Sequence, residues 1–281
     1  MFEKFNEYGA IHYGSLGRKT GAYNTKLKKS LLMEEEGDKF QTTVLVQPYL
    51  VTDSEKQMLE QKAKREGYNI QAYISEPVAA ALYYTNQHPE VWWDRRVGVI
   101  NIHKDSTEIS SVNIKTEGIK VESHESIYQG GELLTEKLKN YYTRKLRQMD
   151  GDVLNYAKER HFLYDYAREA AFRLASSRLE EDTFTFVSPQ TGKKYQLSIK
   201  RREFDELMAQ IAKEILQRAD PFDCRHHGII LCGGMAEYDA FADVIKKNDP
   251  ETQVMAYKAH EAEVLGAAIY ARQVHEALGK G

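Results

Sequence analysis

Apolar and polar residues in the first part of the chain alternate between strand-like and helix-like spacing. The run TTVLVQPYL (42–50) is apolar and rich in β-branched residues, which predicts a buried strand. The next segment predicts a helix, because its first residues, TDS, include N-cap formers and Gly67 stands where a C-terminal glycine belongs. A second strand, YNIQAYIS, and a helix that opens with EPVAAALYY follow. The order strand, helix, strand, helix over residues 42–84 is typical of a mostly parallel α/β layer.

The pattern resumes after a polar connection, residues 85–96, in which Trp92 and Trp93 are either core packing or an exposed anchor for a partner. Residues 97–114, VGVINIHKDSTEISSVNI, predict a hairpin whose tip, HKDS, lacks glycine. Another strand, GIKVESHESI, two helices, a hairpin within FTFVSPQTGKKYQLSIK and a third helix follow. A buried strand with a glycine turn, IILCGGMAEYDAF, then leads to a closing helix, HEAEVLGAAIYARQVHEAL.

Composition and charge exclude several classes of protein. The chain has 281 residues, of which 42% are hydrophobic, as in globular proteins. Its net charge of −3 does not indicate a protein that binds nucleic acid or an anionic membrane. No apolar run approaches the roughly 18 residues that span a bilayer. The two cysteines, Cys224 and Cys232, predict no disulfide framework, and the start, MFEKFNEYGA, lacks a secretory layout. We expect a cytoplasmic protein, with the mitochondrial matrix as the alternative.

Four segments, in order along the chain, resemble one family. They are YISEPVAAALYY (73–84), IYQGGELLTEKLKNYY (127–142), IILCGGMAEYDAFADVI (229–245) and HEAEVLGAAIYA (260–271). Each segment is short, but four in the same order with suitable spacing are a specific signal. Together they resemble the nucleotide-binding (ATPase) domain of the heat shock protein 70 (DnaK-like) chaperone family, within the actin-like ATPase superfamily. The resemblance covers residues 42–275.

The resemblance implies an α/β fold, the two-lobed actin-like ATPase (ribonuclease-H-like) fold, with the N-terminal lobe reduced. Residues 1–96 would form the reduced first lobe, in which residues 1–41 are not placed. Residues 97–258 would form the second lobe, with 129–203 as its outer subdomain, and residues 259–281 a closing helix that returns to the first lobe. A large part of the first lobe, mostly its outer subdomain, is expected to be missing on the N-terminal side.

The resemblance also implies a nucleotide site, which this sequence alters. The family binds ATP phosphates with two glycine-rich hairpin tips, because successive backbone N–H groups must approach the phosphates closely, and each tip follows a strand that ends in aspartate. The second tip reads Asp-Leu-Gly-Gly-Gly-Thr-Phe-Asp in the family. Here this phosphate tip is degenerate, with an amide at the leading carboxylate and side chains at all three glycines: Asn101, His103, Lys104 and Asp105. In the first tip, AIHYGS (10–15) places His12 at the aspartate.

Other positions of the site keep family-like residues. These vestigial nucleotide-binding candidates are Glu76, Ser106, Glu108, Gly130, Gly131, Glu169, Arg173, Ser176, Gly233 and Gly234. Three of them belong to EAAFRLASS (169–177), which resembles the family's adenine-binding helix. Positions that favour strand-to-helix packing are retained, whereas positions that serve phosphate and metal are lost. We therefore expect no catalytic residues, no metal-binding residues and no bound cofactor, with ATP or ADP as the alternative.

Several short segments have simpler interpretations. GSLGRKTG (14–21) lacks the glycine that a P-loop needs before its lysine and is interpreted as a loop. DCRHH (223–227) has no second ligand pair at a zinc-like spacing and is interpreted as a polar loop rather than a metal site. KLKKSLLMEEE (26–36) is interpreted as a solvated segment, with a partner contact as the alternative. Four histidines that are isolated in the sequence are assigned to the surface or to ordinary packing: His12, His88, His124 and His161.

These observations predict a chaperone-like pseudo-ATPase domain. It would act as a non-catalytic regulatory or structural subunit that binds a protein partner within a stable complex. The partner would cover the face left bare by the missing subdomain, since an exposed sheet edge on a solitary chain favours aggregation. The alternative is a divergent ATP-binding chaperone domain that still binds nucleotide and hydrolyses it slowly. We expect no nucleic-acid partner and no membrane span.

Overall fold

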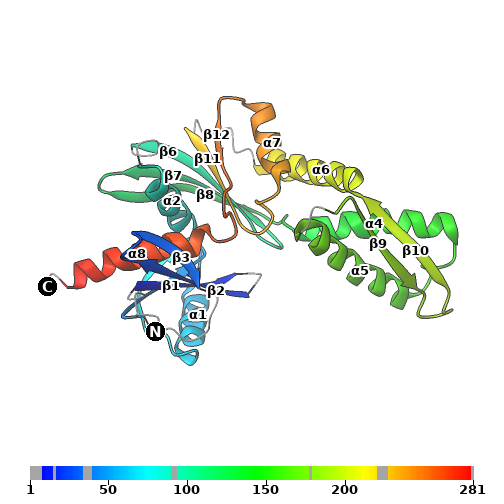
Figure 1. Cartoon of the computed structure of the whole chain (residues 1–281), viewed down its shortest axis with the longest axis horizontal. Helices are drawn as coiled ribbons and strands as arrows, with labels where there is room; N and C mark the ends of the chain where they lie inside the picture. The colour runs from blue at the N-terminus through cyan, green and yellow to red at the C-terminus, as the bar shows by residue number, and fades with distance from the viewer. Residues whose placement is uncertain are drawn as a thin grey trace.

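Two five-stranded sheets form the two lobes of the molecule (Figure 1). The computed structural model describes residues 8–14, 17–33, 40–89, 94–176, 179–219 and 227–279. The first sheet has the strand order β3-β2-β1-β4-β5, and the second has the order β8-β7-β6-β11-β12. In each sheet, the first strand in chain order is therefore central, with the second and third strands on one side and the fourth and fifth on the other.

The first lobe is built on strands β1 (Tyr8–Gly14), β2 (Gly17–Asn24), β3 (Lys29–Met33), β4 (Thr42–Gln47) and β5 (Ile70–Ser75). β1, β2 and β3 pair antiparallel, whereas β1, β4 and β5 run parallel. Helix α1 (Asp53–Arg65) connects β4 to β5, and helix α2 (Glu76–Gln87) follows β5. The expected start of α1 is confirmed, because Thr52 and Glu55 form a capping box that satisfies backbone N–H groups of the first turn.

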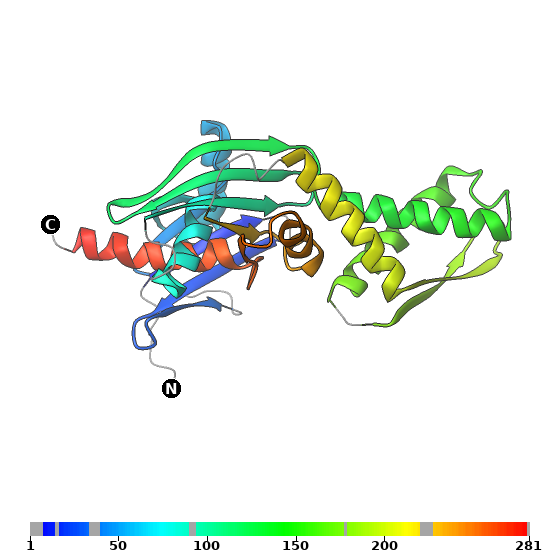
Figure 2. The same cartoon turned by 90° about the horizontal axis from the view of Figure 1, so that it is seen from above.

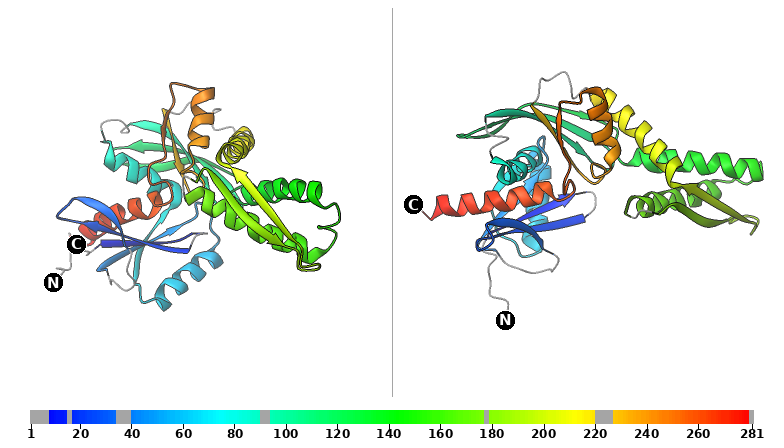
Figure 3. Two further views of the ribbon diagram at one scale, coloured as in Figure 1. Left: turned by 45° about the vertical axis from the view of Figure 1, so that its right-hand side comes forward. Right: turned by 45° about the horizontal axis from the view of Figure 1, so that its top comes forward.

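The second lobe repeats this arrangement with β6 (Arg95–Ile102), β7 (Thr107–Lys115), β8 (Gly118–Ile127), β11 (Gly228–Cys232) and β12 (Gln253–Met255). Helix α7 (Asp239–Asn248) connects the two last strands, and α8 (Ala262–Leu278) follows them. α8 returns to the first lobe and packs against α2 through one shared apolar cluster rich in alanine (Figure 3). The predicted two-lobed actin-like ATPase fold is thereby confirmed.

An outer subdomain projects from the second lobe (Figure 2). It contains α4 (Glu132–Met149), α5 (Ala157–Ser176), β9 (Glu181–Val187), β10 (Lys194–Lys200) and α6 (Arg201–Ala219). Aromatic rings hold its helices to its hairpin, since the Phe184 ring lies 5.0 Å from that of Tyr142 and 4.8 Å from that of Tyr166, measured between centroids. These elements occupy the connection between β8 and β11.

The unplaced N-terminal residues form three strands of the first sheet. The interpretation of GSLGRKTG as a loop is wrong for residues 17–21, which lie in β2, and that of residues 29–33 as solvated is wrong because they form the half-buried strand β3. The first sheet therefore has all five strands. Residues 34–41 separate β3 from β4, and the expected reduction of the first lobe stays a prediction.

Some sequence predictions fall outside the described residues. Trp92, Trp93 and Cys224 are among them, so their predicted roles stay predictions. Within the part of the chain that the structure describes, every helix is too short or too polar to cross a membrane.

Candidate functional site

The two lobes meet at a buried carboxylate, Glu76, the first residue of α2. Its Oε1 lies 2.9 Å from Nε2 of His12 in β1, and its Oε2 accepts a hydrogen bond of 2.9 Å from Nδ2 of Asn101 in β6. All three residues are at most 6% exposed. They come from the carboxyl ends of the central strands and from the residue after β5, where open α/β sheets usually place ligands.

The tip between β6 and β7 adds a second imidazole and a second carboxylate. His103 Nε2 lies 3.2 Å from Oε2 of Glu76 and 3.9 Å from Oε1 of Glu108. Glu108 pairs with Asn101 across the β6–β7 ladder, so the two residues flank the tip. The structure thus brings together four residues that the sequence placed near the phosphate site: Glu76, Asn101, His103 and Glu108.

The charged side chains of this cluster shift one another's pKa values. Burial lowers the pKa of His103, but its hydrogen bond to Glu76 and the charges of Glu76 and Glu108 outweigh burial and raise the pKa to about 9. The pKa of His12 is raised despite burial, because Glu76 and Glu263 favour its cation. Burial opposes ionisation of Glu76, yet both imidazoles hold the pKa of its carboxyl well below the usual range. At neutral pH, Glu76 is therefore a carboxylate and His103 an imidazolium.

Two further residues of the cluster, Glu263 and His124, were not predicted from the sequence. Glu263, at the start of α8, is 2% exposed, and its Oε2 lies 4.0 Å from Nδ1 of His12. The Nε2 atom of His124, in β8, lies 4.0 Å from Oε2 of Glu108, and its Nδ1 atom lies 2.9 Å from the hydroxyl oxygen of Ser110. The assignment of His12 to the surface or to ordinary packing is therefore wrong, because its imidazole faces two buried carboxylates, whereas His124 packs against Ser110 and Tyr49 beside the partly exposed Glu108.

One signal in the sequence points to Glu263. It is the only charged residue among residues 262–271, AEVLGAAIYA, which are otherwise apolar apart from one tyrosine hydroxyl. A lone carboxylate in a buried helix segment needs a partner, because an unpaired charge is costly away from water. The sequence does not show that this partner is His12, some 250 residues earlier.

The backbone of the β6–β7 tip is held by a hydrogen bond within the tip and by two hydrogen bonds from the start of α4. The N–H of His103 donates to the Ser106 carbonyl at 2.9 Å, while the N–H of Gly131 and that of Glu132 donate to the carbonyls of His103 (2.8 Å) and Lys104 (2.7 Å). A Cβ on Gly130 would lie 2.4 Å from the His103 oxygen. Glycine at 130 is thus required for this packing whether or not a nucleotide binds.

The remaining predicted residues lie apart from the cluster or at its rim. Lys104 and Asp105 are exposed, and Lys104 Nζ lies 3.8 Å from Oε2 of Glu132. Gly233 and Gly234 form the turn after β11, half-buried and exposed respectively.

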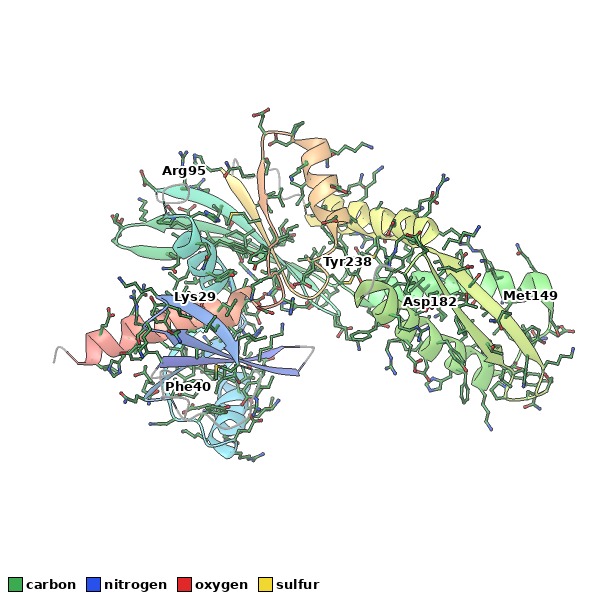
Figure 4. The ribbon with its side chains drawn as sticks, in the orientation of Figure 1. Lys29, Phe40, Arg95, Met149, Asp182 and Tyr238 are labelled. Carbon is green, nitrogen blue, oxygen red and sulfur yellow. The ribbon has the colours of Figure 1, made fainter. Side chains whose placement is uncertain are left out.

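The adenine-helix candidates lie on α5 in the outer subdomain. Arg173 makes a bidentate pair with Asp182 of β9, with Nε–Oδ1 at 2.8 Å and a second nitrogen at 3.0 Å from Oδ2. Figure 4 shows Asp182 well inside this subdomain. Glu169 lies 3.6 Å from Arg173, and the side chain of Ser176 falls outside the described residues. Their role in binding nucleotide stays a prediction.

Two hollows lie on the surface of the second lobe and its outer subdomain. A groove of about 920 Å³ between α6 and α7 is lined by charged, polar and apolar side chains and by none of the predicted nucleotide-site residues. A shallow hollow of about 410 Å³ lies over α5 and is lined by Arg168, Glu169, Phe172 and Arg173.

The cluster does not suit a magnesium-bound triphosphate. Mg²⁺ prefers oxygen ligands in a near-octahedral arrangement, supplied by carboxylates, water and phosphates. At the ends of β1 and β6, however, the side chains are an imidazole and an amide, and both oxygens of Glu76 already have partners. The imidazolium of His103 lies between the tip and α2, so the protein supplies its own cation there.

The whole chain was also compared with protein families. A family model described as Hsp70 protein matches residues 22–277, which is most of the chain. The match begins within β2 and ends within α8, so it leaves out β1 and includes every later strand and the outer subdomain. Together with the duplicated fold and the position of the cluster between the lobes, this match shows that the chain belongs to the Hsp70 family.

Proposed function

We propose that this chain is a non-catalytic domain of the Hsp70 family, a pseudo-ATPase that acts as a regulatory or structural subunit. The observation that carries the proposal is the contact of two imidazoles, His12 and His103, with one buried carboxylate, that of Glu76. This arrangement satisfies the charges between the two tips without magnesium or phosphate. It also ties the lobes together, since Glu76 belongs to the first lobe and His103 to the second.

Phosphoryl transfer relies on positioned carboxylates and metal ions to orient the attacking water and neutralise the developing charge. Asn101 offers a neutral amide where the family has a carboxylate, and His12 is a cation when protonated. Asp105 places an additional exposed carboxylate at the tip itself. Like charges about 4 Å apart repel by about 1–4 kcal/mol at effective dielectric constants between 80 and 20, which disfavours a polyphosphate there.

A protein partner is supported by the edge of the second sheet. β8 is the outermost strand, half of its residues are exposed, and no strand among the described residues pairs with its outer side. An unpaired strand edge of this length presents backbone N–H and C=O groups to any chain that can add a strand. We expect the partner to be a polypeptide held within a stable complex.

The alternative is a divergent domain that binds nucleotide without efficient hydrolysis. The hollow over α5 favours it, because Glu169 and Arg173 line this hollow and belong to the helix that resembles the family's adenine-binding helix. Adenosine contacts there would not require the altered tip. This alternative predicts binding that depends on the base more than on the phosphates.

Hydrolysis can be measured directly as phosphate release from Mg-ATP by the purified chain. We expect release no faster than in buffer alone, because the water-orienting carboxylates and the metal ligands are missing. A matched variant, Glu76→Gln, separates true turnover from a contaminating ATPase. Magnesium-dependent release by the unmodified chain that disappears in this variant would refute the proposal.

A further inference from the structure

Three side chains of the inter-lobe cluster converge on one point. Glu76, His103 and Glu108 each offer a ligand atom, and these atoms lie within 4.8 Å of one another. Glu76 comes from the first lobe, whereas His103 and Glu108 flank the β6–β7 tip of the second. We propose that these three residues bind one divalent transition-metal ion of the Zn²⁺ class, which displaces the Nε2 proton of His103 to solvent and joins the two lobes.

The spacing of the ligand atoms fits a tetrahedral ion. Zinc binds imidazole nitrogen and carboxylate oxygen at about 2.1 Å, so two such ligands lie about 3.4 Å apart around a tetrahedral ion. The observed distance from His103 Nε2 to Glu76 Oε2 is 3.2 Å, and that from His103 Nε2 to Glu108 Oε1 is 3.9 Å. The longer of the two distances involves the Glu108 side chain, which is partly exposed and can adjust.

The ligand types select the class of metal. An imidazole combined with carboxylates suits zinc and its neighbours among the first-row metals, whereas magnesium prefers an all-oxygen octahedral site. His103 stands where the family pattern has glycine, so that pattern does not itself supply this nitrogen ligand. The site therefore differs in chemistry from one that serves a magnesium nucleotide.

A buried polar atom without a partner supports a bound cation independently. Asn101 is 3% exposed, its Nδ2 donates to Glu76 Oε2, and its Oδ1 has no hydrogen-bond partner among the described residues. Rotation of the amide by half a turn exchanges the two atoms. This rotation would turn Oδ1 toward Glu76. An oxygen atom there would be repelled by the carboxylate alone, but it could bind a cation held between the two side chains.

The ligands are held by a second layer of contacts, as metal ligands generally are. His12 fixes the carboxylate of Glu76 through the 2.9 Å contact to Oε1, which leaves Oε2 facing His103. His124, anchored by Ser110, lies 4.0 Å from Oε2 of Glu108. Access for an ion remains, since the side chains of His103 and Glu108 are 22% and 18% exposed.

The test is calorimetric titration of the full chain, freed of metal with EDTA and dialysed, with zinc chloride and separately with magnesium chloride. We expect one zinc ion per chain and no magnesium binding at the same concentrations. His103→Gln and Glu108→Gln should each weaken zinc binding by about 100-fold or more, and His12→Gln by about 10-fold, as expected for ligands and for a supporting residue.

Two control variants address other zinc ligands of the chain. His161→Gln removes an exposed imidazole that lies 3.6 Å from Asp165, and Cys224→Ser removes the thiol of DCRHH (223–227). Neither should change the affinity. Circular dichroism checks that each variant folds, and the visible spectrum of the cobalt-substituted unmodified chain reports nitrogen and oxygen ligation without any variant.

Two results would overturn the proposal: no zinc binding by the unmodified chain, or binding that Cys224→Ser abolishes and His103→Gln leaves intact. The inference stands apart from the proposed function. A chain that hydrolyses ATP and also binds zinc here would contradict only the pseudo-ATPase proposal, and a chain that does neither would contradict only the metal site.

Discussion

Replacing Glu76 with glutamine is expected to lower the free energy of unfolding by about 3 kcal/mol. Removing one partner of a buried ion pair usually costs about 3–5 kcal/mol, because the other charge is left buried without compensation. Here two imidazoles lose their partner at once. Each imidazole can respond by releasing its proton, which is why we expect the lower end of this range.

The measurement is urea unfolding of both proteins at neutral pH with EDTA present, so that bound metal does not contribute. The matched control is Glu206→Gln, which removes a carboxylate 3.0 Å from Arg202 on the exposed side of α6. Exposed pairs contribute about 0–1 kcal/mol, so the control should change little. Equal, small losses in the two variants would mean that the inter-lobe cluster does not stabilise the fold.

Replacing Gly266 with alanine is expected to cost about 3 kcal/mol of stability, the upper end of the usual range for overpacking a core. Gly266 lies where α8 crosses α2, and a Cβ there would lie 1.8 Å from the backbone oxygen of Ala79. Backbone cannot rotate away as a side chain can, so the two helices would have to separate. Because these helices pack between the lobes, separating them would weaken the contacts between the two lobes as well.

Gly151→Ala is the control for this second variant, since nothing lies within 4 Å of its added Cβ. Alanine at a glycine position with compatible backbone angles leaves stability unchanged or raises it slightly. Thermal unfolding followed by circular dichroism compares the two variants. A Gly266→Ala protein as stable as Gly151→Ala would show that α2 and α8 are not packed as closely as described.

Periodic segments of the chain predicted its fold well where local rules decide the structure. The start of α1 followed from its cap, and the β6–β7 hairpin from two apolar runs around a polar tip. The first three strands were not predicted, because the sequence of β2, GRKTGAYN, combines charged residues with glycines and resembles a loop. Gly21 in fact serves close packing, since a Cβ there would lie 2.8 Å from the Val264 oxygen of α8.

The candidate site was harder to predict because its contacts join residues far apart in the sequence. The resemblance pointed to Glu76, to the altered tip and to His12 at the first tip, but it did not show their partners, and nothing next to His12 or His124 in sequence is one. Only the sheet order brings β1 beside β4 and the tip of β6 toward α2. Isolation in the sequence therefore says little about the partners of a histidine in a strand.

The central claim is that the protein's own side chains occupy the place of the magnesium and phosphates. Calorimetric titration of the metal-free chain with Mg-ATP, with adenosine titrated separately, tests it most directly. The account predicts no saturable binding of Mg-ATP at micromolar concentrations beyond any binding that adenosine alone shows. One-to-one micromolar binding of Mg-ATP that is lost when magnesium is withheld would contradict it.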